Sequence, residues 1–310
     1  MLTLGLVSHA AAQQYPTRPV RLIVGFAPGG ATDIAARAVA QKLGEALRQS
    51  VVVDNRPGAA GNLGAELVAR AAPDGYTVLL ANATIAIPSL FKSLPFDVTK
   101  DFAPVSLVGA GPSALVVHPS LPVRNVGELI ALAKKRSGEL NYASGGTGNI
   151  THLAMVLFTG MTAIDMTHIP YKGGGPSTVA TVSGEAQLMF SSVASTLPHI
   201  KQGRLRALGV SSAKRSLALP EVPTVAEAGL PGYEASSWYG LLLPAATPAA
   251  IVERLGSEAA KAVESADLKQ RLVSQGIEPV PGGAAAFSRY LSNEIPKWAK
   301  VIKDARIPAQ

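Results

Sequence analysis

The sequence predicts an α/β fold in which two lobes, each built on a doubly wound sheet, are joined by a hinge. The first observation is an alternation of strand-length apolar runs with amphipathic helical patterns, repeated along most of the chain. The second is a C-terminal segment with three helical patterns and too few strands for a sheet of its own. We therefore expect residues 15–121 and 239–310 to form one lobe, and residues 122–238, with the hinge crossings, to form the other.

The first unit of this pattern is the clearest one. Residues 20–26 form a nearly continuous apolar run, as expected for a strand buried on both faces, and Pro28, Gly29 and Gly30 end it. From Thr32 to Leu47 the apolar residues recur every three or four positions, which is typical of one face of a helix. The glycine turn therefore lies at a helix N-terminus, where unpaired amides and the helix dipole favour an anion.

The remaining elements follow in order. In the first lobe we expect a strand at 51–55, a helix after the glycines at 58, 61 and 64, a strand at 77–81, an irregular connection over 91–109 and a strand at 115–119. The second lobe is expected to contain helices from 125, 149, 176 and 193, and strands at 140–143, 166–169, 187–190 and 205–210. A strand at 239–243 and helical patterns from 248, 267 and 284 return to the first lobe. The crossings are expected near 121–124 and 233–238.

Composition narrows the classes of function. The formal charge of +7 is compatible with an anionic ligand, but the basic residues are scattered and aromatic residues make up only 5% of the 310 residues. Nucleic-acid binding, which uses basic surfaces with aromatic platforms, is therefore not expected. The chain has no cysteine, which removes disulfides, thiol catalysis and cysteine metal sites but leaves the compartment open.

The N-terminus favours export. Residues 2–7 are apolar, and Ala10, Ala11 and Ala12 fit the small-residue pattern before a signal-peptidase cut. A basic region is missing and the apolar run is short. A translation start assigned too far downstream would explain both departures from a typical signal peptide. We interpret residues 1–12 as a shortened signal peptide; the alternative is an irregular cytosolic N-terminus.

Candidate binding residues lie after the strands, where ligands sit in doubly wound sheets. Each strand-to-helix turn there offers small residues, hydroxyls or exposed amides, which can hold a carboxylate by charge-assisted hydrogen bonds. The turns are residues 28–33, 82–84, 144–149, 171–175 and 191–192. If two lobes face each other, these turns converge on one cleft.

Simpler interpretations of the same turns stay open. The glycine turn at 28–30 can be an ordinary connection, and Asp33 can cap its own helix. Residues 144–149 can form a flexible turn in which Thr147 or Asn149 caps the next helix. Tyr171 and Lys172 can lie in a solvated surface turn.

Enzymatic motifs are not found. The sequence has no GxSxG elbow and no GxxxxGK[ST] phosphate loop, and the glycines from Gly58 onward miss the dinucleotide spacing at Ala60 and Leu63. The histidines show no metal-binding spacing. We therefore expect no catalytic residue, no metal and no cofactor; the alternative from another class is a cytosolic α/β enzyme that acts on an acidic small molecule.

Several long motifs resemble one family. VRLIVGFAPGGATDIAAR, VVVDNRPGAAGNLGAELVARAAPDGYTVLL, SGGTG followed by His152, HIPYKGGGP and RALGVSSAKRSLALPEVPTVAEAGLPGYEASSWYGLLLPAATP are similar to Bug-type solute-binding proteins of tripartite tricarboxylate transporters. The resemblance runs from about Tyr15 to the C-terminus.

This resemblance implies a periplasmic binding protein, type II-like, whose two lobes close on a small organic carboxylate without catalysis. It also implies membrane subunits of the transporter, or a sensor protein, as partners; we expect a monomer. The ligand-binding residues carried over are Phe26, Gly29, Gly30, Thr32, Asp33, Asn82, Ser144, Gly145, Thr147, Tyr171 and Lys172. Thr84 and Ser191 join them because of their places after strands. Many relatives have an acidic residue in the helix after YKGGGP, where this chain has TVATV at 178–182.

Overall fold

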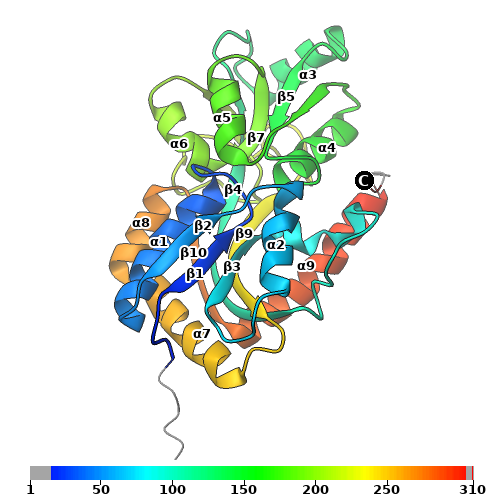
Figure 1. Ribbon diagram of the computed structural model, residues 1–310. Helices are drawn as coiled ribbons and strands as arrows, with labels where there is room; N and C mark the ends of the chain where they lie inside the picture. The colour runs from blue at the N-terminus through cyan, green and yellow to red at the C-terminus, as the bar shows by residue number, and fades with distance from the viewer. Residues whose placement is uncertain (1–14, 305–308, 310) are drawn as a thin grey trace, which may run out of the picture.

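A computed structural model describes residues 15–304 and residue 309 (Figure 1). The interpretation of residues 1–12 as a signal peptide lies outside the described residues. The strands are β1 (Val20–Val24), β2 (Val51–Asn55), β3 (Thr77–Asn82), β4 (Phe102–Val117), β5 (Asn141–Ser144), β6 (Thr167–Pro170), β7 (Leu188–Ser192), β8 (Arg206–Val210), β9 (Ser236–Pro244) and β10 (Glu278–Gly283). The helices are α1 (Ala31–Leu47), α2 (Asn62–Ala69), α3 (Val126–Lys135), α4 (Ile150–Thr162), α5 (Gly174–Val182), α6 (Val193–Lys201), α7 (Ala249–Glu264), α8 (Ala266–Ser274) and α9 (Ala284–Asp304).

The first group of elements is a sheet with helices on both faces, in the lower half of Figure 1. β2, β1 and β3 run parallel, whereas β9 pairs antiparallel with β3, and β4 pairs antiparallel with β9 and β10. Leu22 and Val24 of β1 pack in the core with α1, α7 and α8, and Ile23 packs in the core with α2 and α9. Burial on both faces explains why β1 is apolar throughout.

The second group is the smaller sheet in the upper half of Figure 1, with α3 to α6 around it. β6, β5 and β7 run parallel, and the end of β4 pairs antiparallel with β7 and β8. Ala114 and Val116 of β4 share a core with Met189, Val193 and Leu197. The predicted alternation of strands and helices is therefore present in both groups.

β4 belongs to both sheets. Its residues 102–112 pair with β9, and Ser113 to Val117 pair with β7. The chain therefore passes from one sheet to the other at Pro112 and Ser113, before the expected crossing at 121–124. The return crossing lies at the start of β9, within the expected segment 233–238. The division of the chain at residues 121 and 239 stays a prediction, although residues 113–117 pair with the second group.

The expected irregular connection over 91–109 is wrong from Phe102 onward, where β4 begins. Pro104 has no amide to donate, and the register against β9 shifts beside it and again before Gly109. The same features explain why the sequence did not predict β10. Its residues 278–283 include two prolines and two glycines, and its register against β4 shifts between Pro279 and Gly282. Strands with proline and bulges lose the periodicity that a sequence pattern needs.

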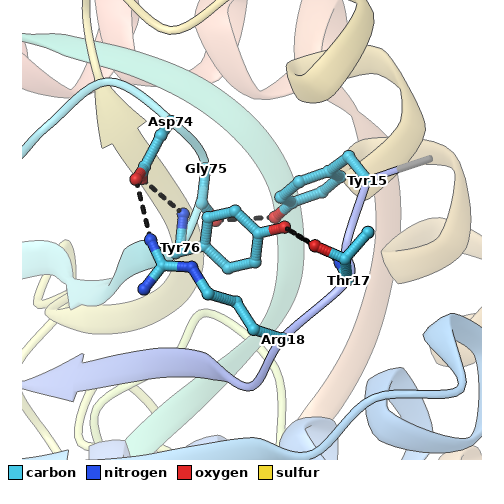
Figure 2. Close-up of polar contacts among 6 residues, drawn as sticks. All are labelled: Tyr15, Thr17, Arg18, Asp74, Gly75 and Tyr76. Atoms are coloured by element: carbon cyan, nitrogen blue, oxygen red, sulfur yellow. Dashed lines mark hydrogen bonds and ion pairs between the residues drawn. The ribbon is translucent and has the colours of Figure 1, made fainter. Parts of the chain in front are cut away.

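The first described residues are held against the turn before β3 (Figure 2). The Tyr15 hydroxyl donates a hydrogen bond to the Gly75 carbonyl at 2.6 Å, and the Thr17 amide donates to the Tyr76 hydroxyl at 2.9 Å. Arg18 pairs with Asp74 at 3.0 Å and lies over the Tyr76 ring. These contacts tie the chain to the first sheet directly ahead of β1. No helix within residues 15–304 has both the length and the apolar character of a membrane span.

Candidate functional site

The glycine turn after β1 opens the N-terminus of α1 to the space between the two groups. Gly29 has φ +81°, a conformation that side chains other than glycine rarely adopt. Gly30 precedes the helix, and no side chain caps α1. The first amides of α1 are therefore available to a ligand, at the positive end of the helix dipole.

Asp33 holds this turn from behind. Its carboxylate accepts hydrogen bonds from the Gly29 amide, the Arg37 Nε and the Asn55 side chain, each at 3.0 Å. The Asn55 amide group also donates to the Phe26 carbonyl at 2.9 Å. Burial opposes ionisation, but the hydrogen bonds from Arg37, Gly29 and Asn55 outweigh it, so the pKa of Asp33 lies below its usual value. Asp33 is thus engaged with the protein itself.

A second uncapped helix faces the first one. α5 follows Gly173 with no side-chain cap, and a β-carbon on Gly30 would lie 3.4 Å from the amide nitrogens of Gly174 and Gly175. α4 and α6 begin nearby, capped by Asn149 and Ser192. Four helix N-termini therefore converge, which creates a positive potential without any cationic side chain.

Between these helix ends lies a cavity of about 40 Å³. Its lining is formed by Phe26, Gly30, Ala31, Thr32, Asn82, Ser113, Asn149, Ile150, Thr151, Gly174, Ser191, Ser192, Ser195, Ser237 and Tyr239. None of these residues is charged, and most carry a hydroxyl or an amide. A cavity of this size holds a few water molecules, so an organic acid needs the two groups to separate before it can enter.

One polar atom in the lining has no partner. Ser191 is 1% exposed, and its Oγ makes no hydrogen bond. Nearby, Asn82 donates to the Thr32 hydroxyl at 3.1 Å and accepts from the Thr84 amide at 3.0 Å. A buried hydroxyl without a partner costs free energy, so Ser191 is suited to a ligand that supplies one.

The two groups touch directly around the cavity. The Ala27 amide donates to the Lys172 carbonyl at 3.1 Å, and the Ile150 amide donates to the Thr84 hydroxyl at 3.3 Å. Each bond joins the first group to the second. The structure is therefore a closed arrangement of the cleft.

The sequence-predicted site residues fall into two sets. Those lining the cavity are Phe26, Gly30, Thr32, Asn82 and Ser191. Those outside its lining are Gly29, Asp33, Thr84, Ser144, Gly145, Thr147, Tyr171 and Lys172. Of these, Gly29 and Tyr171 line an adjoining groove of about 580 Å³, which shares Ser195 with the cavity. The role of each residue in binding stays a prediction.

Several residues outside the cavity lining have protein partners instead. The Ser144 hydroxyl lies 2.6 Å from His168 Nε2, and the Gly145 amide donates to the Thr151 hydroxyl at 2.9 Å. The Tyr171 hydroxyl donates to Glu185 at 2.7 Å. The side chain of Lys172 is exposed, and its carbonyl makes the bond to Ala27.

Sequence reasoning missed the far wall of the cavity. Ser113 comes from β4, where the chain passes to the second sheet, whereas Ser237 and Tyr239 come from β9, where the chain returns to the first sheet. The rule of looking after parallel strands does not reach such residues. Only knowledge of which strands connect the sheets could have found them.

A stack of aromatic rings supports the turn at 144–149. His152 and His168 stack at 4.2 Å, and Tyr142 stacks on His168 at 4.8 Å. The Gly148 amide donates to His152 Nδ1 at 3.2 Å, so this nitrogen carries no proton. Burial lowers the pKa of both histidines to about 4, with each ring neutral at pH 7. Within the described residues, no three His, Asp or Glu side chains are grouped to hold a metal ion.

Two α/β groups joined through β4, with an uncharged cavity lined by amides and hydroxyls between them, are typical of a two-lobed solute-binding protein. The family model described as tripartite tricarboxylate transporter family receptor, TctC, matches residues 35–307. The chain belongs to this family, as the sequence motifs predicted.

Solved structures agree with this assignment. The chain is 38% identical to R. palustris Rpa4515, solved with adipate, with a TM-score of 0.92 over 95% of this chain and 99% of that one. It is 32% identical to the periplasmic binding protein BugD, with a TM-score of 0.92 over 96% of this chain and 100% of that one. MatC from Rhodopseudomonas palustris, with bound malate, is 31% identical, with a TM-score of 0.89 over 93% of this chain and 100% of that one.

The predicted fold and periplasmic location are therefore confirmed. The protein is a solute-binding receptor, and the alternative of a cytosolic enzyme is set aside because the family is one of receptors. Membership in the family implies membrane subunits of the transporter as partners.

Proposed function

We propose that this receptor captures a small dicarboxylate in the cleft between its two sheets and presents it to the membrane subunits of a tripartite tricarboxylate transporter. The observation that carries the proposal is the convergence of uncapped helix N-termini on a buried cavity without a charged residue. Amides and hydroxyls of this kind bind carboxylates. Adipate in Rpa4515 and malate in MatC are both dicarboxylates.

The residues divide into those that touch the ligand and those that hold the turns. The amides at the starts of α1 and α5 take one carboxylate, with Thr32, Asn82 and Ser191 as side-chain partners. Asp33 fixes the glycine turn, whereas Ser144 and Gly145 fix the turn before α4. The hydroxyls of Ser113, Ser192, Ser195, Ser237 and Tyr239 contact the rest of the ligand.

Binding proceeds by closure. The lobes rotate about two places: near Pro112, where β4 passes from the first sheet to the second, and near Ser236, where the chain returns to the first sheet at the start of β9. A ligand that touches both lobes favours the closed arrangement because it has more contacts there. We expect the protein to perform this cycle as a monomer. Size-exclusion chromatography with light scattering tests this expectation.

A thermal-shift panel on refolded, ligand-free protein tests the proposal. The panel contains adipate, malate, the matching monocarboxylates, uncharged diols of equal length and nucleotides. A ligand at about 100 times its Kd adds about 2.7 kcal/mol to the free energy of unfolding. We expect dicarboxylates to raise the Tm and diols to leave it unchanged. A rise in Tm with nucleotides alone contradicts the proposal. If a dicarboxylate raises the Tm but a strain that carries the transporter does not grow on that acid, the result favours sensing over uptake.

A further inference from the structure

One close approach between the two lobes has backbone on both sides. A β-carbon on Gly175 would collide with the carbonyl oxygen of Pro28, and would lie 3.2 Å from the carbonyl carbon of Gly29 and 3.3 Å from the nitrogen of Gly30. All three are main-chain atoms, which cannot rotate away as a flexible side chain can. The closed arrangement therefore leaves no room for any side chain at position 175.

This contact crosses the cleft. The turn at 28–30 follows β1 of the larger sheet, and Gly175 lies in the first turn of α5, which follows β6 of the smaller sheet. The hydrogen bond from Ala27 to the Lys172 carbonyl lies beside it. Separation of the lobes removes the collision, because its two sides belong to different lobes.

The backbone conformation at this position does not require glycine. Gly175 is not among the residues with positive φ, unlike Gly29 and Gly173. It is half-buried and lies in a helix, where alanine is favoured over glycine. Alanine at 175 is thus acceptable to α5 itself and unacceptable only to the closed cleft.

We infer that Gly175 is a closure-determining residue: its bare backbone lets the N-termini of α1 and α5 approach the same carboxylate, and any side chain there holds the lobes apart. This inference rests on the proposed function, because it concerns the same ligand and the same motion. An open-locked receptor keeps the contacts of one lobe and loses those of the other. The affinity for a dicarboxylate then falls although no ligand-binding group has been changed.

The test compares Gly175→Ala with the wild type and with Gly160→Ala, a matched control in α4. A β-carbon on Gly160 meets nothing within 4 Å. Because the chain has no cysteine, Lys135→Cys in α3 and Glu253→Cys in α7 give two exposed labelling sites at opposite ends of the molecule (Figure 1). Calorimetric titration with the dicarboxylate that raises the wild-type Tm most gives affinity, and Förster transfer between the labels reports closure.

We expect Gly160→Ala to bind and close like the wild type. Gly175→Ala should have an equal or higher Tm without ligand, at least a hundredfold weaker affinity, and no ligand-induced change in Förster transfer. The inference is overturned if Gly175→Ala binds and closes like the wild type. It is also overturned if the ligand-free variant shows no thermal unfolding transition, because the close approach of Gly175 to the turn at 28–30 would then serve folding. If the wild type itself neither binds nor closes, the proposed function has failed instead.

Discussion

The carboxylate of Asp33 accepts a hydrogen bond from the main-chain amide of Gly29 at 3.0 Å, so Asp33 fixes the turn that we propose binds the ligand. Its other partners, Arg37 and Asn55, do not line the cavity. The glycine turn is thereby held open toward the cleft before any ligand arrives. Such preorganisation reduces the entropy that binding has to overcome.

Asp33→Asn should weaken both the fold and the site. Loss of charge-assisted hydrogen bonds at a buried position costs about 2 kcal/mol in the free energy of unfolding, and the loosened turn should weaken ligand binding about tenfold. The folded pKa of Asp33 lies below its unfolded value. Its contribution to stability is therefore present above about pH 4 and is lost as the pH falls through the folded pKa. Urea unfolding at pH 7 and pH 3 measures it; an unchanged affinity would remove Asp33 from the site.

Ser191→Ala should separate binding from stability. The hydroxyl is buried without a partner, so its removal should leave the Tm of the ligand-free protein unchanged or higher. A hydrogen bond to a carboxylate is worth about 1.5–3 kcal/mol, so affinity should fall about 10- to 100-fold. Ser106→Ala is the control: Ser106 is fully buried and bonded to the Leu107 and Gly282 carbonyls outside the cleft. Ser106→Ala should lower the Tm and keep the affinity. If Ser191→Ala lowered the Tm and kept the affinity, Ser191 would not be a ligand-binding residue.

Lys172→Ala tests whether a cation takes part. The side chain is exposed and does not line the cavity, and the bond to Ala27 uses the carbonyl, which alanine keeps. We expect less than about a threefold change in Kd, because a solvated charge outside the site is screened. Titration in 20 and 200 mM salt measures this directly. A tenfold loss on substitution would instead support the prediction that Lys172 binds the ligand.

Acid should destabilise the protein through His152. Burial depresses its pKa from 6.5 to about 4, so the unfolded chain binds more protons than the folded one between these values. The full stability is present above pH 6.5 and is lost as the pH falls toward 4, by about 3 kcal/mol for this group. His152→Asn keeps an acceptor for the Gly148 amide and removes the titration. Its Tm should vary less over this range than that of the wild type; an identical pH profile would contradict this explanation.

The sequence was most informative where the partners are neighbours in the chain. β1, the glycine turn and α1 could be predicted because apolar periodicity and glycine positions act locally. The turns after β3, β5, β6 and β7 could be located for the same reason. Thr32 and Asn82 lie in those turns, and the resemblance to the family added Phe26; all three line the cavity that the structure contains.

What the sequence could not supply depends on contacts between distant segments. Ser144 pairs with His168 rather than with its near neighbour His152, because a parallel register of β5 and β6 brings them together. Ser237 and Tyr239 reach the cavity only because the chain returns to the first sheet at β9, between β3 and β4. The collision that a side chain at position 175 would cause involves two turns that are far apart in sequence. No local pattern distinguishes Gly175 from its neighbours.

The central claim is that a dicarboxylate is held between the starts of α1 and α5. A crystal structure of the protein with the dicarboxylate that gives the largest Tm shift tests it most directly. The account predicts carboxylate oxygens within hydrogen-bond distance of the amides of Ala31 or Thr32 and of Gly174 or Gly175, with Ser191 Oγ as a further partner. A ligand bound elsewhere, or one that contacts a single lobe in a closed protein, would contradict it.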